Sequence, residues 1–154
     1  MAVKKKILLI SSEFPPQPGG IGEHAYNLAR IFHHAGFQVA VLTNSRGEDI
    51  GVEERFDAGL PFKVRRVFRH RFALVTYVKR GLDFFNLLLK NPRCIVLASG
   101  KFSLWMGALG HSFFSKNIYL GVVHGTEINP AGSLAKWLTH KSLGRTRGID
   151  FCTM

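Results

Sequence analysis

A proline- and glycine-rich segment near the start of the chain constrains the fold most strongly. An apolar run over residues 7–10 ends at Ser11, and it is followed by three prolines and three glycines, Gly19, Gly20 and Gly22. Proline cannot continue a central strand, so the segment predicts a buried strand, a glycine-rich turn and then a helix. Backbone amides at such a turn bind phosphate or another anion. The spacing differs from the dinucleotide pattern G-x-G-x-x-G and does not indicate NAD binding.

Strand and helix patterns alternate along the rest of the chain. Buried strands are expected at residues 6–11, 38–43, 94–98, 117–123 and 149–153, and a half-exposed strand at 62–68. Helices are expected at 21–35, 72–89, 102–114 and 134–143, where apolar residues recur every three or four positions. Residues 44–61 are polar and predict a long loop, with a short extra strand as an option. This alternation predicts an α/β fold, a Rossmann-like parallel sheet with helices on both faces.

The helix expected at 72–89 depends on one apolar series. Its members are Val75, Val78, Leu82, Phe85 and Leu89. Their spacing of three and four residues is typical of the buried stripe of a helix.

Composition limits the possible classes of function but does not distinguish among those that remain. The 154 residues suit a single domain, and 21 Lys+Arg against 10 Asp+Glu give a net charge of +11. Such an excess attracts nucleic acid, anionic lipid or phosphorylated substrates. No nucleic-acid module signature occurs, so nucleic acid is not an expected partner. No apolar run approaches the roughly 18 residues of a spanning helix, and we expect a cytoplasmic protein, with peripheral contact on the inner face of the membrane as an alternative.

Cysteine and histidine spacing gives no metal signature. Cys94 and Cys152 both lie in apolar runs, which indicates reduced thiols rather than a disulfide or a zinc site. We therefore expect neither a metal nor a resident cofactor.

The carboxyl ends of the predicted strands carry two groups of candidate residues. Right-handed crossovers bring these ends to one edge of the sheet, where ligands bind in such folds. Glu13 and His24 flank the glycine turn, and His124 and Glu127 follow the strand at 117–123. An imidazole there binds a sugar hydroxyl or titrates near neutral pH, and a carboxylate accepts hydrogen bonds from hydroxyls. The alternative is a histidine that only holds its own loop in place.

A basic stretch interleaved with aromatic residues follows the half-exposed strand. It includes Arg65, Arg66, Arg69 and Arg71, together with Lys63, Lys79 and Arg80. Basic and aromatic side chains together fit an interfacial membrane site. The alternative is a solvated face whose apolar members belong to the core.

Two motifs carry a family resemblance. Phe14-Pro15-Pro16 with Gly19-Gly20-Ile21-Gly22, then His24, Asn27-Leu28-Ala29 and Gly36-Phe37-Gln38-Val39, resembles the amino-terminal signature of retaining glycosyltransferases of the GT4 type, which have the GT-B fold. His124-Gly125-Thr126-Glu127 resembles the second amino-terminal motif of that family. The resemblance covers the chain from Lys4 to about Asp150.

The resemblance implies one half of a two-domain enzyme that transfers a sugar from a nucleotide-sugar donor to a sugar or lipid-linked acceptor. Gly19, Gly20 and Gly22 would contact the donor phosphates and sugar, and His124 would lie beside the donor sugar as the catalytic residue. Glu13, His24 and Glu127 would lie on the acceptor side. Transfer would retain the anomeric configuration and need no metal.

The same resemblance makes residues 1–154 an amino-terminal, acceptor-side domain without its donor domain. We expect this chain alone to be inactive, with a carboxyl-terminal domain or a separate chain completing the cleft. The alternative function is a non-catalytic basic Rossmann-type module that binds an anionic membrane or a partner chain.

Overall fold

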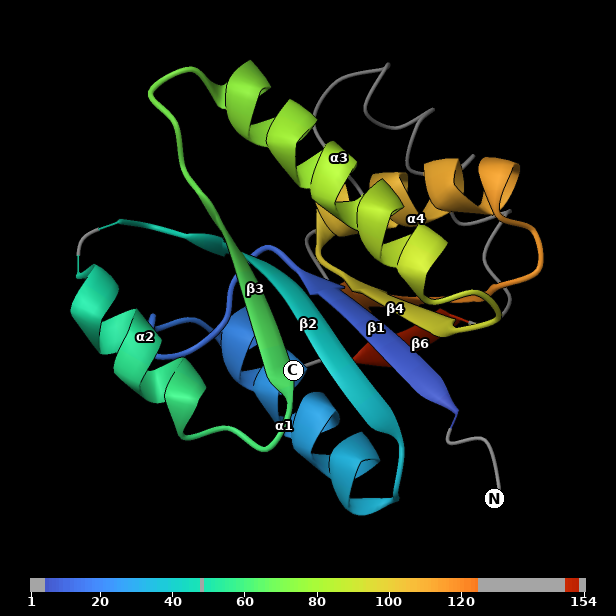
Figure 1. Ribbon diagram of the computed structural model, residues 1–154, viewed down its shortest axis with the longest axis horizontal. Helices are drawn as coiled ribbons and strands as arrows, with labels where there is room; N and C mark the ends of the chain where they lie inside the picture. The colour runs from blue at the N-terminus through green and yellow to red at the C-terminus, as the bar shows by residue number, and fades with distance from the viewer. Residues whose placement is uncertain (1–4, 48, 125–148, 153–154) are drawn as a thin grey trace.

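The computed structural model describes residues 5–47, 49–124 and 149–152, which form a parallel sheet between two layers of helices (Figure 1). The strands are β1 (Lys6–Ser11), β2 (Gln38–Ser45), β3 (Lys63–Phe68), β4 (Ile95–Ser99), β5 (Ile118–His124) and β6 (Ile149–Cys152). The helices of this part are α1 (Gly20–His34), α2 (Ile50–Ala58), α3 (Ala73–Lys90) and α4 (Lys101–Phe113). The helix expected at 134–143 lies outside the described residues.

All strand pairs are parallel, and the order is β3-β2-β1-β4-β5-β6. The central strand β1 pairs with β2 and β4, so that Leu9 lies between Val41 and Leu97. Figure 1 shows α1 and α2 on one face of the sheet and α3 and α4 on the other. This is the predicted Rossmann-like fold, and it brings the carboxyl ends of the strands to one edge.

The core has two halves because successive side chains of a strand point to opposite faces. Leu8 and Ile10 pack with Phe84 of α3 on one side. Ile7 and Leu9 pack with residues of α1 on the other. Both faces of β1 are therefore buried, as the continuous apolar run predicted.

One helix was missed by the sequence patterns. The loop predicted for residues 44–61 contains α2, whose cap is Asp49: its carboxylate accepts from the Val52 amide at 3.0 Å. The helix is short, and Glu53 is its buried residue. A helix that buries a carboxylate carries almost no apolar period for sequence reasoning to detect.

The helix α3 exists as predicted but turns a different stripe toward the core. The buried residues are Thr76, Arg80, Phe84 and Leu88, spaced four apart. Leu82 and Leu89 of the predicted stripe are 67% and 68% exposed. Val78, Leu82 and Leu89 of the predicted stripe therefore lie on the outward face, whereas Val75 and Phe85 are half-buried.

Arg80 is the charged member of this buried stripe, and its contacts lie in the interior. Its side chain is 1% exposed, and Nη2 donates to the carbonyl oxygen of Ser11 at 2.7 Å and to Ser103 Oγ at 2.9 Å. The guanidinium also lies 5.3 Å from the ring centre of Phe102. Burial lowers the pKa of Arg80 to about 10, so it stays charged at neutral pH. The side chain links α3 to the ends of β1 and the start of α4.

Replacing Arg80 by alanine should destabilise the fold by about 2–4 kcal/mol, because two buried acceptors lose a charged donor and a packed side chain disappears. Arg80→Met should lose less, since it keeps the aliphatic packing and removes the buried charge. Urea unfolding of both variants, beside exposed Lys79→Ala as the control, measures the difference. Equal stability of Arg80→Ala and Lys79→Ala would contradict the linking role.

None of the helices in the described part of the chain is long and apolar enough to cross a membrane.

Candidate functional site

The glycine-rich turn lies where β1 ends and α1 begins. It is at the edge of the sheet where the carboxyl ends of the strands meet, which we call the ligand edge because ligands bind there in folds of this kind. Gly19 is the N-cap of α1, and no side chain of the described residues caps the helix there. The first amide groups of a helix have no partner within the helix, and the helix dipole makes this end positive. The turn therefore presents backbone donors and partial positive charge to the edge of the sheet.

The three glycines serve different physical needs. Gly19 has a φ of 157°, and a Cβ added there would lie 2.3 Å from Glu13 Oε2. At Gly22 a Cβ would lie 3.1 Å from the backbone nitrogen of Phe14, so this glycine allows α1 to pack closely on the turn. At Gly20 a Cβ would meet nothing within 4 Å. Only Gly20 opens onto free space where a ligand has room.

The other predicted residues of this turn lie beside it. The carboxylate of Glu13 lies against Gly19, and its Oε1 is 3.9 Å from Nη2 of Arg46. His24 is half-buried in the second turn of α1. The structure thus brings Glu13 and the glycine turn together.

The second predicted motif is described only at its first residue. His124 is the last residue of β5, and β4 lies between β5 and β1 in the sheet. Its backbone therefore reaches the same edge as the glycine turn. Its side chain and residues 125–127, with Glu127, lie outside the described residues, and their roles stay predictions.

The basic stretch does not form one surface, and the prediction for Arg66 was wrong. Its side chain is 7% exposed, and Nε and Nη2 bind the carboxylate of Asp57 in α2 at 2.8 and 2.9 Å. Nη1 lies 3.6 Å from Oε1 of Glu53, and Nη2 also donates to the carbonyl oxygen of Pro15. Arg66 is unavailable to a membrane because it ties α2 to the turn that precedes α1.

Arg80 is the second residue of this stretch that the structure removes from the surface, as described above. Arg65 is exposed and donates to Asp83 of α3 at 2.7 Å, and this pairing raises its pKa further. Arg69 and Arg71 follow the end of β3 and are exposed. The five arginines of this stretch therefore have three different environments: Arg66 and Arg80 are buried, Arg65 is paired with Asp83, and Arg69 and Arg71 are exposed.

A pocket of about 270 Å³ lies beside the glycine turn, at the carboxyl ends of β1, β2 and β3. Its charged and polar lining residues are Glu13, Asn44, Arg46, Arg69, His70, Arg71, Thr76 and Tyr77, with Ser12, Gln17 and Ser45. Sequence reasoning missed Asn44 and Arg46. The rule that strand ends meet at one edge would have found them if it had been applied to β2 as well.

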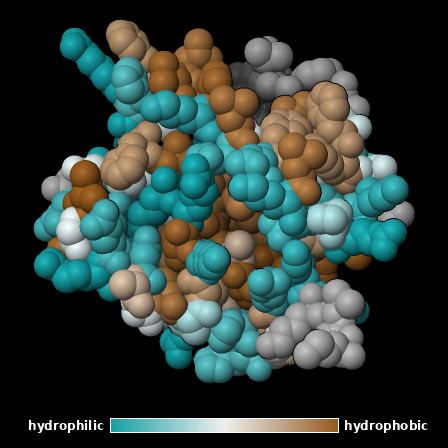
Figure 2. All heavy atoms as spheres, in the orientation of Figure 1, coloured by the Kyte–Doolittle hydropathy of each residue, from teal (hydrophilic) through white to brown (hydrophobic). Residues whose placement is uncertain are grey.

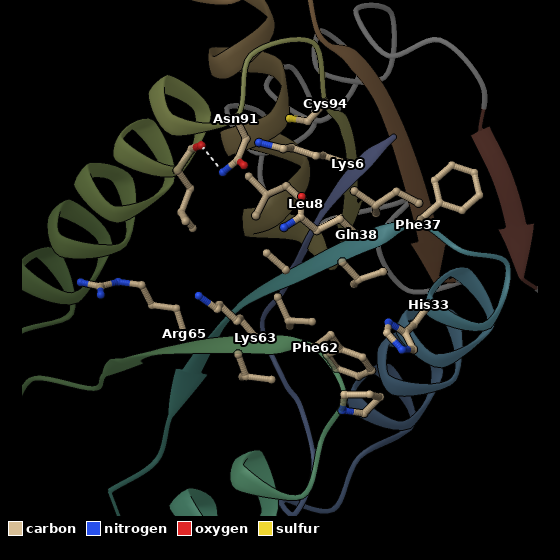
Figure 3. A pocket seen from close by; sticks show the side chains of 17 residues that line it. Lys6, Leu8, His33, Phe37, Gln38, Phe62, Lys63, Arg65, Asn91 and Cys94 are labelled. Carbon is tan, nitrogen blue, oxygen red and sulfur yellow. Dashed lines mark hydrogen bonds between the residues drawn. The ribbon is translucent and has the colours of Figure 1, made fainter. Parts of the chain in front are cut away.

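A larger cavity, with a volume of about 730 Å³, lies elsewhere among the described residues (Figure 3). It is lined by Lys6, Gln38 and Lys63, the first residues of β1, β2 and β3, and it reaches Cys94. It therefore opens toward the amino ends of the strands, away from the ligand edge. Burial raises the pKa of the Cys94 thiol to about 11, which makes this cysteine a poor nucleophile.

Among the described residues no group of three or more His, Cys, Asp or Glu side chains is placed to hold a metal ion.

Two valine substitutions in the glycine turn should separate packing from open space. Gly22→Val should lower the free energy of unfolding by more than about 2 kcal/mol, because the side chain would overlap the backbone at Phe14. Gly20→Val should lower it by less than about 1 kcal/mol, since its Cβ has room. Denaturant unfolding checks both, and a Gly20→Val protein as unstable as Gly22→Val would contradict the open site.

Comparison of the sequence with protein families and with curated proteins gives no match. Comparison with solved structures does. The N-terminal domain of trehalose-6-phosphate phosphatase from Candida albicans has a TM-score of 0.62 at 12% identity, over 96% of this chain and 40% of that chain. MurG from Acinetobacter baumannii has a TM-score of 0.57 at 14% identity, over 96% and 40%.

UDP-GlcNAc 2-epimerase from Methanocaldococcus jannaschii also has a TM-score of 0.57, at 16% identity, over 97% of this chain and 39% of that chain. The chain thus spans about two fifths of the length of these structures. At such low identity the likeness concerns the fold, and this chain shares the Rossmann-like α/β fold of these proteins.

Proposed function

We propose that this chain is the amino-terminal, acceptor-side half of a retaining GT-B glycosyltransferase of the GT4 type. The observation that carries the proposal is the open space at Gly20, at the positive end of α1 and the carboxyl end of β1. The fold it shares with MurG and with an epimerase named for UDP-GlcNAc supports the same conclusion at a coarser level.

The proposed chemistry assigns each group of residues a task. The amides at Gly19, Gly20 and Gly22 bind the donor phosphates and stabilise negative charge as the nucleotide leaves. His124 contacts the sugar that is transferred, and Glu13, His24 and Glu127 bind the acceptor. The facing half of the cleft holds the rest of the donor, so neither half alone is expected to turn over.

The test compares Gly20→Val with Gly81→Val in a protein completed by its facing domain. Gly81 lies in α3, and a Cβ there also meets nothing within 4 Å. Transfer from a nucleotide sugar should fall at least about tenfold in Gly20→Val, because the side chain fills the space where amides meet phosphate. The control should keep its rate. An unchanged rate in Gly20→Val, with normal melting, would reduce the turn to a structural feature.

A second candidate function, peripheral binding to an anionic membrane, is favoured by the outward face of α3. Leu74, Val78, Leu82 and Leu89 are all exposed along this face. Figure 2 shows hydrophobic side chains gathered over α3. The exposed cations Lys79 and Lys90 lie on the same helix, and an apolar stripe with basic neighbours suits a helix that rests in the headgroup region. This property is compatible with either glycosyl transfer or a non-catalytic module.

Serine substitutions on α3 test the membrane contact. Leu74→Ser and Leu82→Ser should each reduce partitioning onto phosphatidylglycerol vesicles by about tenfold, because each removes a large apolar side chain from the interface. Ile31→Ser is the matched control, since Ile31 is also exposed but lies on α1 in the other helix layer. Sedimentation with vesicles measures binding. Equal losses in all three variants, or no binding of the unaltered chain, would contradict this contact.

A further inference from the structure

We infer that the pocket at the carboxyl ends of β1, β2 and β3 binds the phosphate group of a phosphorylated sugar or similar polyol. We call it the arginine pocket, after its lining residues Arg46, Arg69 and Arg71. The inference rests on the proposed function only in naming this ligand as the acceptor. It assigns a ligand class to Arg69 and Arg71, for which the sequence offered a membrane contact as one alternative, and to Arg46, which sequence reasoning missed.

The charge of the arginine pocket is unbalanced. Three guanidinium groups line it, and Glu13 is the one carboxylate among its lining residues. Glu13 is 3.9 Å from Arg46, whereas Arg69 and Arg71 form no ion pair with any described residue. Guanidinium groups remain charged and pair with phosphate through two parallel hydrogen bonds. The excess of positive charge among the lining residues therefore favours the binding of an anion.

The loop that carries two of these arginines is held in place by its backbone. The Arg69 amide donates to the carbonyl oxygen of Ser45 at the end of β2, at 3.2 Å. The His70 amide donates to Oγ1 of buried Thr76 at 2.8 Å, and the Phe72 amide donates to Nδ1 of His70 at 3.2 Å. The backbone is thus fixed while the charged ends of Arg69 and Arg71 stay available. Such preorganisation lowers the entropic cost of binding.

Neutral groups in the pocket suit a hydroxylated ligand. The Oδ1 atom of Asn44 is buried and has no hydrogen-bond partner among the described residues. The Asn44 side chain also lines the pocket, and a side-chain amide both donates to and accepts from sugar hydroxyls. Glu13 lies between the pocket and Gly19 and accepts hydrogen bonds from hydroxyls in the same way.

The volume of the pocket limits the size of the ligand that it can hold. Its volume of about 270 Å³ is just below the range of about 300–1,000 Å³ found for drug-sized ligands. One sugar ring with its phosphate fits this space better than a whole nucleotide sugar. A ligand with its phosphate on the arginines would extend its hydroxyls toward Glu13 and the glycine turn.

Calorimetry of the 154-residue chain with glucose 6-phosphate, glucuronate and glucose tests the inference. Glucose 6-phosphate should bind at least tenfold more tightly than the other two, and added salt should weaken it. The double variant Arg69→Gln/Arg71→Gln should lose at least tenfold in affinity, and so should the single variant Arg46→Gln. Lys79→Gln removes an exposed cation outside the pocket and should bind normally. Circular dichroism checks that each variant is folded.

Several outcomes would overturn the inference. Equal affinity for glucose and glucose 6-phosphate would show that the charge of the ligand does not matter. Equal affinity for glucuronate and glucose 6-phosphate would show that the pocket does not prefer phosphate to carboxylate. Unchanged affinity in folded Arg69→Gln/Arg71→Gln places the ligand elsewhere. Binding is measured without donor or turnover, so failure here leaves glycosyl transfer untouched. Binding without any transfer by the completed protein would contradict the proposed function and leave the arginine pocket standing.

Discussion

Two buried guanidinium groups hold the end of β1, and the ligand edge depends on them. Arg80 donates to the carbonyl oxygen of Ser11 from the layer of α3, and Arg66 donates to that of Pro15 from β3. A segment with three prolines has few amides of its own for hydrogen bonding, so its carbonyl groups need donors from elsewhere. These two side chains fix the turn before Gly19 together with the buried ring of Phe14 and the hydrogen bond that Gln17 donates to Glu53.

The same arrangement explains why a strongly basic chain need not have a uniformly basic surface. Arg66 meets Asp57 and Glu53, and Arg80 is held by neutral oxygens and an aromatic ring. These two buried guanidinium groups cannot contact a partner, whatever the net charge of the sequence. The positive charge that stays accessible at the ligand edge is confined to two places. These are the first amides of α1 on one side of Glu13 and the arginine pocket on the other.

The sequence predicted the sheet because continuous apolar runs mark buried parallel strands regardless of their partners. It also placed Glu13 and the glycines at the correct edge. It failed for α2 and for the face of α3, since both bury charged residues whose partners lie far away in the chain. Arg80 of α3 is 69 residues from Ser11, and Glu53 of α2 is 36 residues from Gln17, which donates to it. Local sequence periodicity contains no information about contacts across such separations. An arginine that points inward is therefore predicted to lie on the surface.

The two proposed anion sites lie on either side of Glu13, so the charges of their ligands and of this carboxylate have to be offset. A donor phosphate at Gly20 and an acceptor phosphate in the arginine pocket would repel each other, and both would be repelled by Glu13. The partial positive charge at the start of α1 offsets the first, and three guanidinium groups offset the second. Glu13 itself lies 3.9 Å from Nη2 of Arg46, so this guanidinium partly offsets its charge. The excess of cations over carboxylates in the arginine pocket is therefore what would allow both ligands to occupy the edge at once.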